Sequence, residues 1–313
     1  MKTVLLALLI ATTSTYAQRP NQGEDESAAF VLEGRAALKD GKLEDAAKAL
    51  DQAIALNPRR VEAYVLRSAV YAAKKQYKQG VELMKRAQAL APTDTEVLTA
   101  LGSQLVLSGD PDSGVPLLQT VVQKEPARYD AQILLGHYWH DHAKWSDAIP
   151  AFEAYLQHRP EALAKEDSRH QVELADAYLR AHEPKKAVAM FQDAADHGKG
   201  GTVLRARIGV AWATAAIDCK RAQPLLRDLD PIATYHPEIW LVEGQCALEL
   251  NDANGALQLG KRYLDRAPKE SAAGHALVGE ALASRGNLAD ARKELETARD
   301  LEPGRRRFTV RLA

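Results

Sequence analysis

The stretch ALDQAIALNP (Ala49–Pro58) is an apolar helical segment that ends in proline, and the chain repeats it. Similar segments end in prolines spaced 34 residues apart and then, near the C-terminus, 35 apart: Pro58, Pro92, Pro126 and Pro160, followed by Pro268 and Pro303. A fixed period of this length is typical of repeat proteins, in which each unit buries its apolar face only against its neighbours. The spacing therefore predicts a stack of helical units, each closed by a proline that cannot continue its helix.

Small and large residues recur at fixed places before each of these prolines. The first unit has Gly34, Ala46, Leu50 and Ala53, and the fourth has Gly136, Ala148, Phe152 and Tyr155. Small residues at facing places let two helices approach closely, and a large apolar residue fills the space beside them. Together with the period, this pattern resembles the tetratricopeptide repeat.

The resemblance implies an all-α, right-handed superhelical solenoid of about eight helix-turn-helix units. We expect these units at residues 27–60, 61–94, 95–128, 129–162, 168–201, 202–236, 237–270 and 272–305. The pattern is weaker in the middle, where Lys199 replaces the proline and Pro224 is expected to kink or shorten a helix. Gly260 also departs from the pattern, because it stands where a large apolar residue is expected.

The first 17 residues differ from the rest of the chain. A lysine at position 2 precedes the apolar run Val4–Ala11, and small residues follow up to Ala17. This is the pattern of a secretory signal peptide cleaved after Ala17, and the run is too short for a membrane anchor. We expect an exported protein, in a bacterial periplasm or secreted, with a flexible leader at residues 18–26.

The charges nearly cancel, with 41 Lys and Arg against 42 Asp and Glu. A nucleic-acid-binding protein would normally be basic along one face, so no nucleic-acid partner is expected. No membrane span is expected after signal cleavage. The basic tail at residues 306–313 is interpreted as a turn that covers the last unit, with docking elsewhere as the alternative.

The resemblance also implies a concave groove lined by the first helices of successive units. Its partner-binding residues are expected to be Arg35, Val65, Ala69, Ser103, Val106, Ile133, His137, His140, Asp176, Arg180, Leu241 and Gln245. Some family members hold a terminal carboxylate with a set of Lys, Asn and Arg. Ala69 and Ser103 occupy the places where Asn would be needed, so capture of an acidic C-terminal tail in this groove is not expected.

The stretch HYWHDH (His137–His142) places three histidines and a carboxylate within six residues. Trp139 is expected in the core, whereas His137 and His140 share the concave face. We interpret them as solvated groove residues, and a pH-sensitive partner contact is a second interpretation. A metal site formed by His137, His140 and Asp141 is the third, although the chain has no H-E-x-x-H motif.

Cys219 and Cys246 are the two cysteines of the chain. They are expected in adjacent units, and export would place them in an oxidising compartment. A disulfide is the favoured interpretation, with two buried thiols as the alternative.

The repeat pattern covers nearly all of the expected mature chain. It predicts a non-catalytic scaffold of the cell envelope that binds partner proteins in its groove, with no cofactor. The alternative is a metal-handling or ligand-binding protein that uses His137 and His140. No phosphate-binding glycine loop or nucleophile motif is found.

Overall fold

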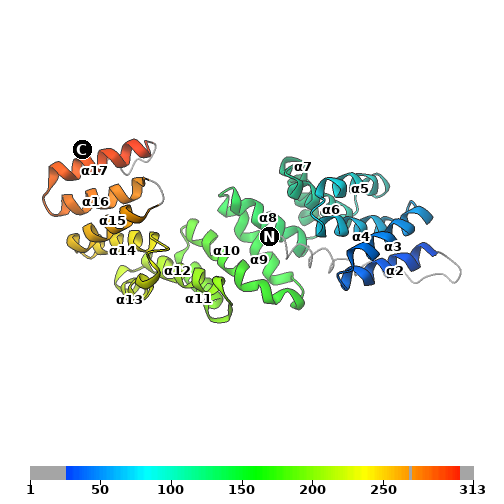
Figure 1. Ribbon diagram of the computed structural model, residues 1–313, viewed down its shortest axis with the longest axis horizontal. Coiled ribbons are helices and arrows are strands. Elements are labelled where there is room, and N and C mark those ends of the chain that lie inside the picture. Colours follow the sequence, from blue (N-terminus) through cyan, green and yellow to red (C-terminus); the bar gives the residue numbers. More distant parts are fainter. Residues whose placement is uncertain (1–25, 268–269, 304–313) are drawn as a thin grey trace. The chain divides into compact units, whose positions relative to one another are not determined.

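The computed structural model describes residues 26–267 and 270–303. The expected signal peptide, most of the leader and the basic tail lie outside this part of the chain. Every regular element among the described residues is helical, with sixteen α-helices, two short 3-10 helices and no strand (Figure 1). The predicted all-α fold class is thereby confirmed.

The chain divides into two compact units, one ending at His170 and one beginning at Gln171. In the first unit, consecutive helices form hairpins that contact their neighbours. These helices are α2 (Glu26–Lys39), α3 (Leu43–Leu56), α4 (Val61–Ala73), α5 (Tyr77–Leu90), α6 (Thr95–Ser108), α7 (Pro111–Lys124), α8 (Tyr129–Asp141) and α9 (Trp145–His158), followed by η2 (Glu161–Glu166). Helix α10 (Asp167–Arg180) begins in the first unit and continues into the second.

The second unit has the same hairpin organisation. Its helices are α11 (Pro184–His197), α12 (Gly201–Ala215), α13 (Cys219–Leu229), η3 (Asp230–Ile232), α14 (Glu238–Glu249), α15 (Ala253–Arg266), α16 (Ala272–Ser284) and α17 (Leu288–Leu301). Helix α13, which contains Pro224, ends after 11 residues, whereas α11, α15 and α17 each have 14. The expected shortening of this helix is therefore observed.

The two helices of a hairpin approach closely because a glycine of one faces a large side chain of the other. A Cβ added to Gly136 in α8 would lie 2.9 Å from a ring carbon of Phe152 in α9. In the second unit, a Cβ on Gly279 would lie 2.8 Å from Leu295. Contacts this short do not occur between real atoms, so the spacing of the helices depends on the missing side chain.

The hairpin that contains Gly260 compensates for its missing large residue. A Cβ on Gly244 in α14 would lie 2.6 Å from Leu277, which comes from helix α16 of the following hairpin. Leu277 is buried in the same core cluster as Ala247 and Leu257. A side chain of the next hairpin therefore fills the space that the pattern assigns to position 260.

The turn inside several hairpins contains a residue in the left-handed backbone region. Gly41, Gly109 and Gly286 have φ values of 74°, 94° and 83°. The same place is occupied by non-glycine residues elsewhere, including Lys75 at 58° and Ala143 at 54°. Residues with a Cβ adopt this conformation at a cost of roughly 1–2 kcal/mol, so these turns are held by the packing of the flanking helices.

Candidate functional site

The expected groove lining of the first unit is partly buried. Helices α2, α4, α6 and α8 contact one another along the stack. The expected exposure of four groove residues is wrong, because their fractional exposures are 6% or less: Val65, Ala69, Ser103 and Ile133. These side chains are covered because the first helices of successive hairpins pack closely against one another.

The other expected groove residues remain accessible. Arg35, Val106, His137 and His140 are half-buried in the first unit. In the second unit Asp176 and Leu241 are half-buried, whereas Arg180 and Gln245 are exposed. The groove that a partner can reach is therefore more polar than the sequence predicted.

The histidines of α8 contact aromatic rings of the same unit. The ring centroid of His137 lies 5.5 Å from Phe152 and 5.4 Å from His170. The ring of His140 lies 5.3 Å from Trp145, and its Nδ1 atom is 3.9 Å from a carboxylate oxygen of Asp141. His137 is thus directed toward α9 and α10, while His140 is directed toward the start of α9.

These orientations keep His137 and His140 from binding one metal ion together with Asp141, as the interpretation of this segment as a metal site requires. Within the described part of the chain, His137, His140 and Asp141 do not bring three ligand atoms within 4.8 Å of one another. The neighbour of His137 is instead His170, which is fully buried and also lies 4.8 Å from the ring of Tyr155. The sequence does not indicate the role of His170, because it lies 33 positions after His137 and only packing brings the two rings together.

Trp139 and His142 complete this segment. Trp139 is half-buried rather than a full core residue, and the Lys144 ammonium lies 4.6 Å from its ring centroid. The His142 Nδ1 atom lies 2.7 Å from the carbonyl oxygen of Tyr138 in the last turn of α8. The same carbonyl oxygen accepts the backbone N–H of His142, so the imidazole adds a second contact at the end of the helix.

Asp130 is a buried carboxylate at the start of α8. It is 4% exposed, accepts a hydrogen bond from the Ala131 backbone N–H, and lies 3.2 Å from the Arg128 Nε atom. Burial raises the pKa of Asp130, and the positive charge of Arg128 opposes this shift. The pair therefore fixes the start of the helix and is largely closed to a partner.

The two cysteines lie in the core of the second unit. Their sulfur atoms are 2.10 Å apart, at bonding distance, and their Cα atoms are 5.1 Å apart. Both residues are buried in one cluster with Leu226 and Trp240. The disulfide links α13, the shortened helix, to α14 of the next hairpin, and so acts as a structural cross-link.

A charged cluster lies beside this disulfide. The indole N–H of Trp240 donates to Asp230 at 2.8 Å, and Arg262 lies 3.2 Å from the same carboxylate and over the Trp240 ring. Burial raises the pKa of the nearby Glu243, and the negative charge of Asp230 adds to this shift. These contacts close the turn between two hairpins.

A model of the tetratricopeptide repeat family matches residues 31–95 and 99–162. These residues are the hairpins of the first unit. The chain is a tetratricopeptide-repeat protein. No curated protein matches the sequence significantly.

Solved structures of tetratricopeptide-repeat proteins share the fold. The C-terminal part of such a protein from Cytophaga hutchinsonii matches with a TM-score of 0.51 and 17% identity, covering 78% of this chain and 97% of its own. YrrB, described as having an unusual peptide-binding site, matches with a TM-score of 0.45 and 20% identity, covering 58% and 92%. MamA matches with a TM-score of 0.44 and 19% identity, covering 55% and 91%. At these identities the similarity shows the fold alone.

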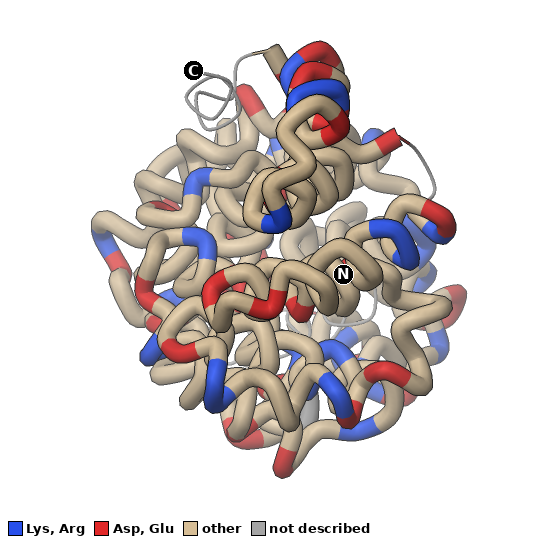
Figure 2. The backbone as a smooth tube through the Cα atoms, turned by 90° about the vertical axis from the view of Figure 1, so that its left-hand side faces the viewer, with Lys and Arg blue, Asp and Glu red and all other residues tan. Residues whose placement is uncertain are grey.

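The described residues have no candidate membrane span, and their charges are mixed. None of their helices is long and apolar enough to cross a bilayer. Acidic and basic residues are interspersed along the helices that face the viewer in Figure 2. Tetratricopeptide repeats generally bind protein partners, and this chain has the corresponding architecture.

Proposed function

We propose that the protein is an exported scaffold of the bacterial cell envelope, which holds a partner protein against the first helices of its repeats. The observation that carries this proposal is the accessible set of side chains on these helices. In the first unit, Val106 supplies an apolar contact, and Arg35, His137 and His140 supply polar ones. A mixture of apolar and charge-bearing side chains on rigid helices suits a peptide or a helix of a partner.

Arg35 shows how the accessible polar groups are positioned. Its guanidinium pairs with Glu62 on the neighbouring first helix, and its side chain remains 32% exposed. A guanidinium held in this way presents donors to a partner with little further loss of side-chain entropy. The second unit offers Asp176 and Arg180, which lie 3.5 Å apart on one turn of α10.

Site-specific photo-crosslinking in the native cells tests the binding face. A benzophenone amino acid at His137, His140 or Val106 is expected to give one dominant crosslinked protein. The matched control is Gln119, which is exposed on α7, a second helix of its hairpin. Absence of any protein adduct from the three positions, with the protein folded and abundant, would remove the scaffold proposal.

Export is tested separately. Intact-mass analysis of the protein from its own cells is expected to show a mature chain that begins at Gln18. As the control, replacing Leu5 and Leu8 with Arg in the apolar run should leave the unprocessed chain inside the cell. A wild-type protein that keeps Met1 and remains in the cytosol would contradict the envelope assignment without affecting the binding-face result.

A further inference from the structure

The second hairpin and the two residues that precede it carry a local excess of positive charge. Residues 59–86 contain eight Lys or Arg and two Glu, a difference of +6, whereas the whole chain has a net charge of −1. The eight cations are Arg59, Arg60, Arg67, Lys74, Lys75, Lys78, Lys85 and Arg86. Such a concentration of charge in one segment is not needed to fold a repeat, because the other hairpins have mixed charges.

Some of these cations are neutralised within the hairpin stack. Arg67 pairs with Asp51 at 2.8 Å, Lys74 with Glu44 at 2.9 Å, and Lys85 with Glu82 at 3.0 Å. Lys78 and Arg86 on α5 are both exposed and have no carboxylate within 4 Å among residues 26–267 and 270–303. Arg86 instead contacts the ring and hydroxyl of Tyr64. The net positive charge of this surface therefore persists after the internal pairs are formed.

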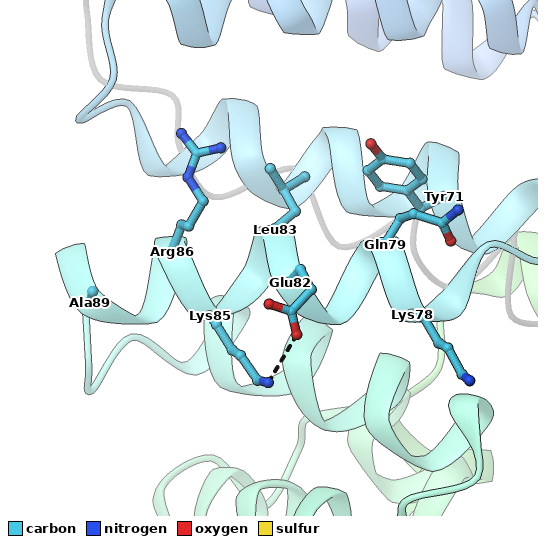
Figure 3. Close-up of a pocket in the computed structure, with 8 residues that line it drawn as sticks. All are labelled: Tyr71, Lys78, Gln79, Glu82, Leu83, Lys85, Arg86 and Ala89. Carbon is cyan, nitrogen blue, oxygen red and sulfur yellow. Dashed lines mark hydrogen bonds and ion pairs between the residues drawn. The ribbon is translucent and has the colours of Figure 1, made fainter.

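Three of these cations, Lys78, Lys85 and Arg86, line a pocket with an apolar floor. The pocket has a volume of about 710 Å³ and is lined by Tyr71 of α4 and by side chains along α5 (Figure 3). Tyr71 and Leu83 are half-buried, and Ala89 is exposed at one end. Figure 3 shows Leu83 and Arg86 on one side of α5, with Lys78, Glu82 and Lys85 on the other. Among the lining residues, three cations stand against one carboxylate.

We propose that this pocket binds an acidic peptide segment of a partner protein, with an apolar side chain on Tyr71 and Leu83. Carboxylates on either side of that side chain would contact Lys78 and Arg86. The side chains that contribute most of the binding free energy at an interface usually fill a well-packed pocket. Charge-assisted hydrogen bonds around such a side chain add to the affinity. This site shares no residue with the groove of the proposed function: its other lining residues are on α5, the second helix of the hairpin, and Tyr71 of α4 is not among the groove residues.

The shape and chemistry of the pocket favour a peptide over other polyanions. A nucleic acid would need a row of cations matched to successive phosphates, and specificity for single strands would need several stacking aromatics. Here a single tyrosine lines the pocket, and its ring is already covered on one side by the Arg67 guanidinium, 4.2 Å from the centroid. An anionic membrane would be attracted by charge alone and would not require the floor formed by Tyr71 and Leu83.

The test is fluorescence anisotropy with the full mature chain and a labelled probe peptide, Glu-Glu-Phe-Glu-Glu. We expect saturable binding that weakens with salt, as required for exposed charge pairs. Lys78→Glu combined with Arg86→Glu should weaken binding by at least about tenfold. The matched control is Arg207→Glu with Lys261→Glu, two exposed residues of the second unit, which should leave the affinity within about twofold.

Two further probes examine the floor and the class of ligand. Glu-Glu-Ser-Glu-Glu should bind several-fold more weakly than the phenylalanine peptide, because the serine cannot fill the apolar floor. The charge-conserving variant Arg86→Lys should retain most binding, which separates loss of charge from loss of the Tyr64 contact. Circular dichroism of each variant establishes that it is folded.

Other outcomes would overturn the proposal. These are equal binding by the charge-reversed variant, no binding of the phenylalanine peptide, or tighter binding of a single-stranded oligonucleotide or of phosphatidylglycerol vesicles. Concentration-dependent self-association abolished by the same charge reversal would assign the surface to a second copy of the chain. None of these results depends on crosslinking from His137, so the two proposals can fail independently.

Discussion

The side-chain amide of Gln104 donates a hydrogen bond from Nε2 to the backbone carbonyl oxygen of Ser68, 2.8 Å away. Gln104 is 1% exposed and lies in α6, while Ser68 is fully buried in α4. The bond therefore joins the first helices of two consecutive repeats. The same side chain occupies the space beside Gly80, where an added Cβ would lie 2.4 Å from the Gln104 Cδ atom.

This arrangement predicts a reversal of sign in a double-mutant cycle. Gly80→Ala in the parent chain should lower the free energy of unfolding by about 1–3 kcal/mol, because the buried amide cannot move away. In a Gln104→Ala background the space is open, and the same change should stabilise by up to about 1 kcal/mol, since Ala favours helix over Gly. Urea denaturation of the four proteins measures both steps. Equal effects of Gly80→Ala in the two backgrounds would show that Gln104 does not impose the restriction.

The disulfide should contribute strongly to the second unit. It closes a loop whose ends are 27 residues apart, which corresponds to about 3–4 kcal/mol in the chain-entropy description. Cys219→Ala with Cys246→Ala should lose stability of this order, and a reducing agent should lower the Tm of the parent alone. Non-reducing mass spectrometry provides the covalent control, and two free thiols in protein from an oxidising compartment would contradict the bond.

The turn at Ala143 offers a stabilising substitution. Its φ of 54° is unfavourable for a residue with a Cβ. Ala143→Gly should therefore raise the free energy of unfolding by up to about 1 kcal/mol, even though glycine is more flexible in the unfolded chain. Ala189→Gly, at an exposed position inside α11, is the matched control and should cost about 1 kcal/mol. Equal losses at the two sites would contradict the strain at Ala143.

Glu243 should make stability depend on pH. Burial and then the charge of Asp230 raise its pKa from the ordinary value of 4.5. Between 4.5 and the raised value, the folded protein binds a proton that the unfolded chain has released, so stability falls as pH rises through this window. Glu243→Gln should remove this decrease and be more stable than the parent above the window.

Denaturation curves at several pH values between about 4 and 8 measure this effect, and Glu249→Gln serves as the control at an exposed position of the same helix. Asp230→Asn should reduce the pH dependence caused by Glu243, although it also weakens the contacts with Trp240 and Arg262. A parent and a Glu243→Gln variant with parallel pH profiles would refute the assignment.

The outer face of α17 should prevent association. Arg292 in α17 occupies the repeat position that Val81 has in α5 and Val115 has in α7. The two valines are 7% and 5% exposed, whereas the Arg292 side chain is 75% exposed. A charged side chain at this place opposes the stacking of an apolar surface on α17, because the charge would have to be buried. Arg292→Val combined with Arg299→Leu should therefore increase the sedimentation coefficient with concentration. Lys293→Val, another exposed position of α17, should not. An unchanged sedimentation coefficient for the double variant would show that these arginines do not prevent stacking.

The accessible part of the binding face was predictable only in part. The repeat period correctly placed Arg35, Val106, His137 and His140 on first helices, because that assignment depends only on spacing along a helix. It gave the wrong exposure for Ala69, Ser103 and Ile133 because exposure depends on how closely the neighbouring first helices approach. The basic pocket beside Tyr71 had a sequence signature, the charge excess in residues 59–86, but its apolar floor is visible only when α4 and α5 are packed.

The sequence by itself determined the helical hairpins, since proline spacing and the alternation of small and large residues act locally and between adjacent helices. It also placed Cys219 and Cys246 in neighbouring hairpins, whereas their bonding distance is set by the packing of α13 and α14. Tertiary structure decided which partner each buried group meets: His170 beside His137, and Gln104 against Ser68. These contacts join residues more than 30 positions apart. They depend on the distances and angles between packed helices. The periodic pattern predicts that the helices pack, but it does not specify these distances and angles.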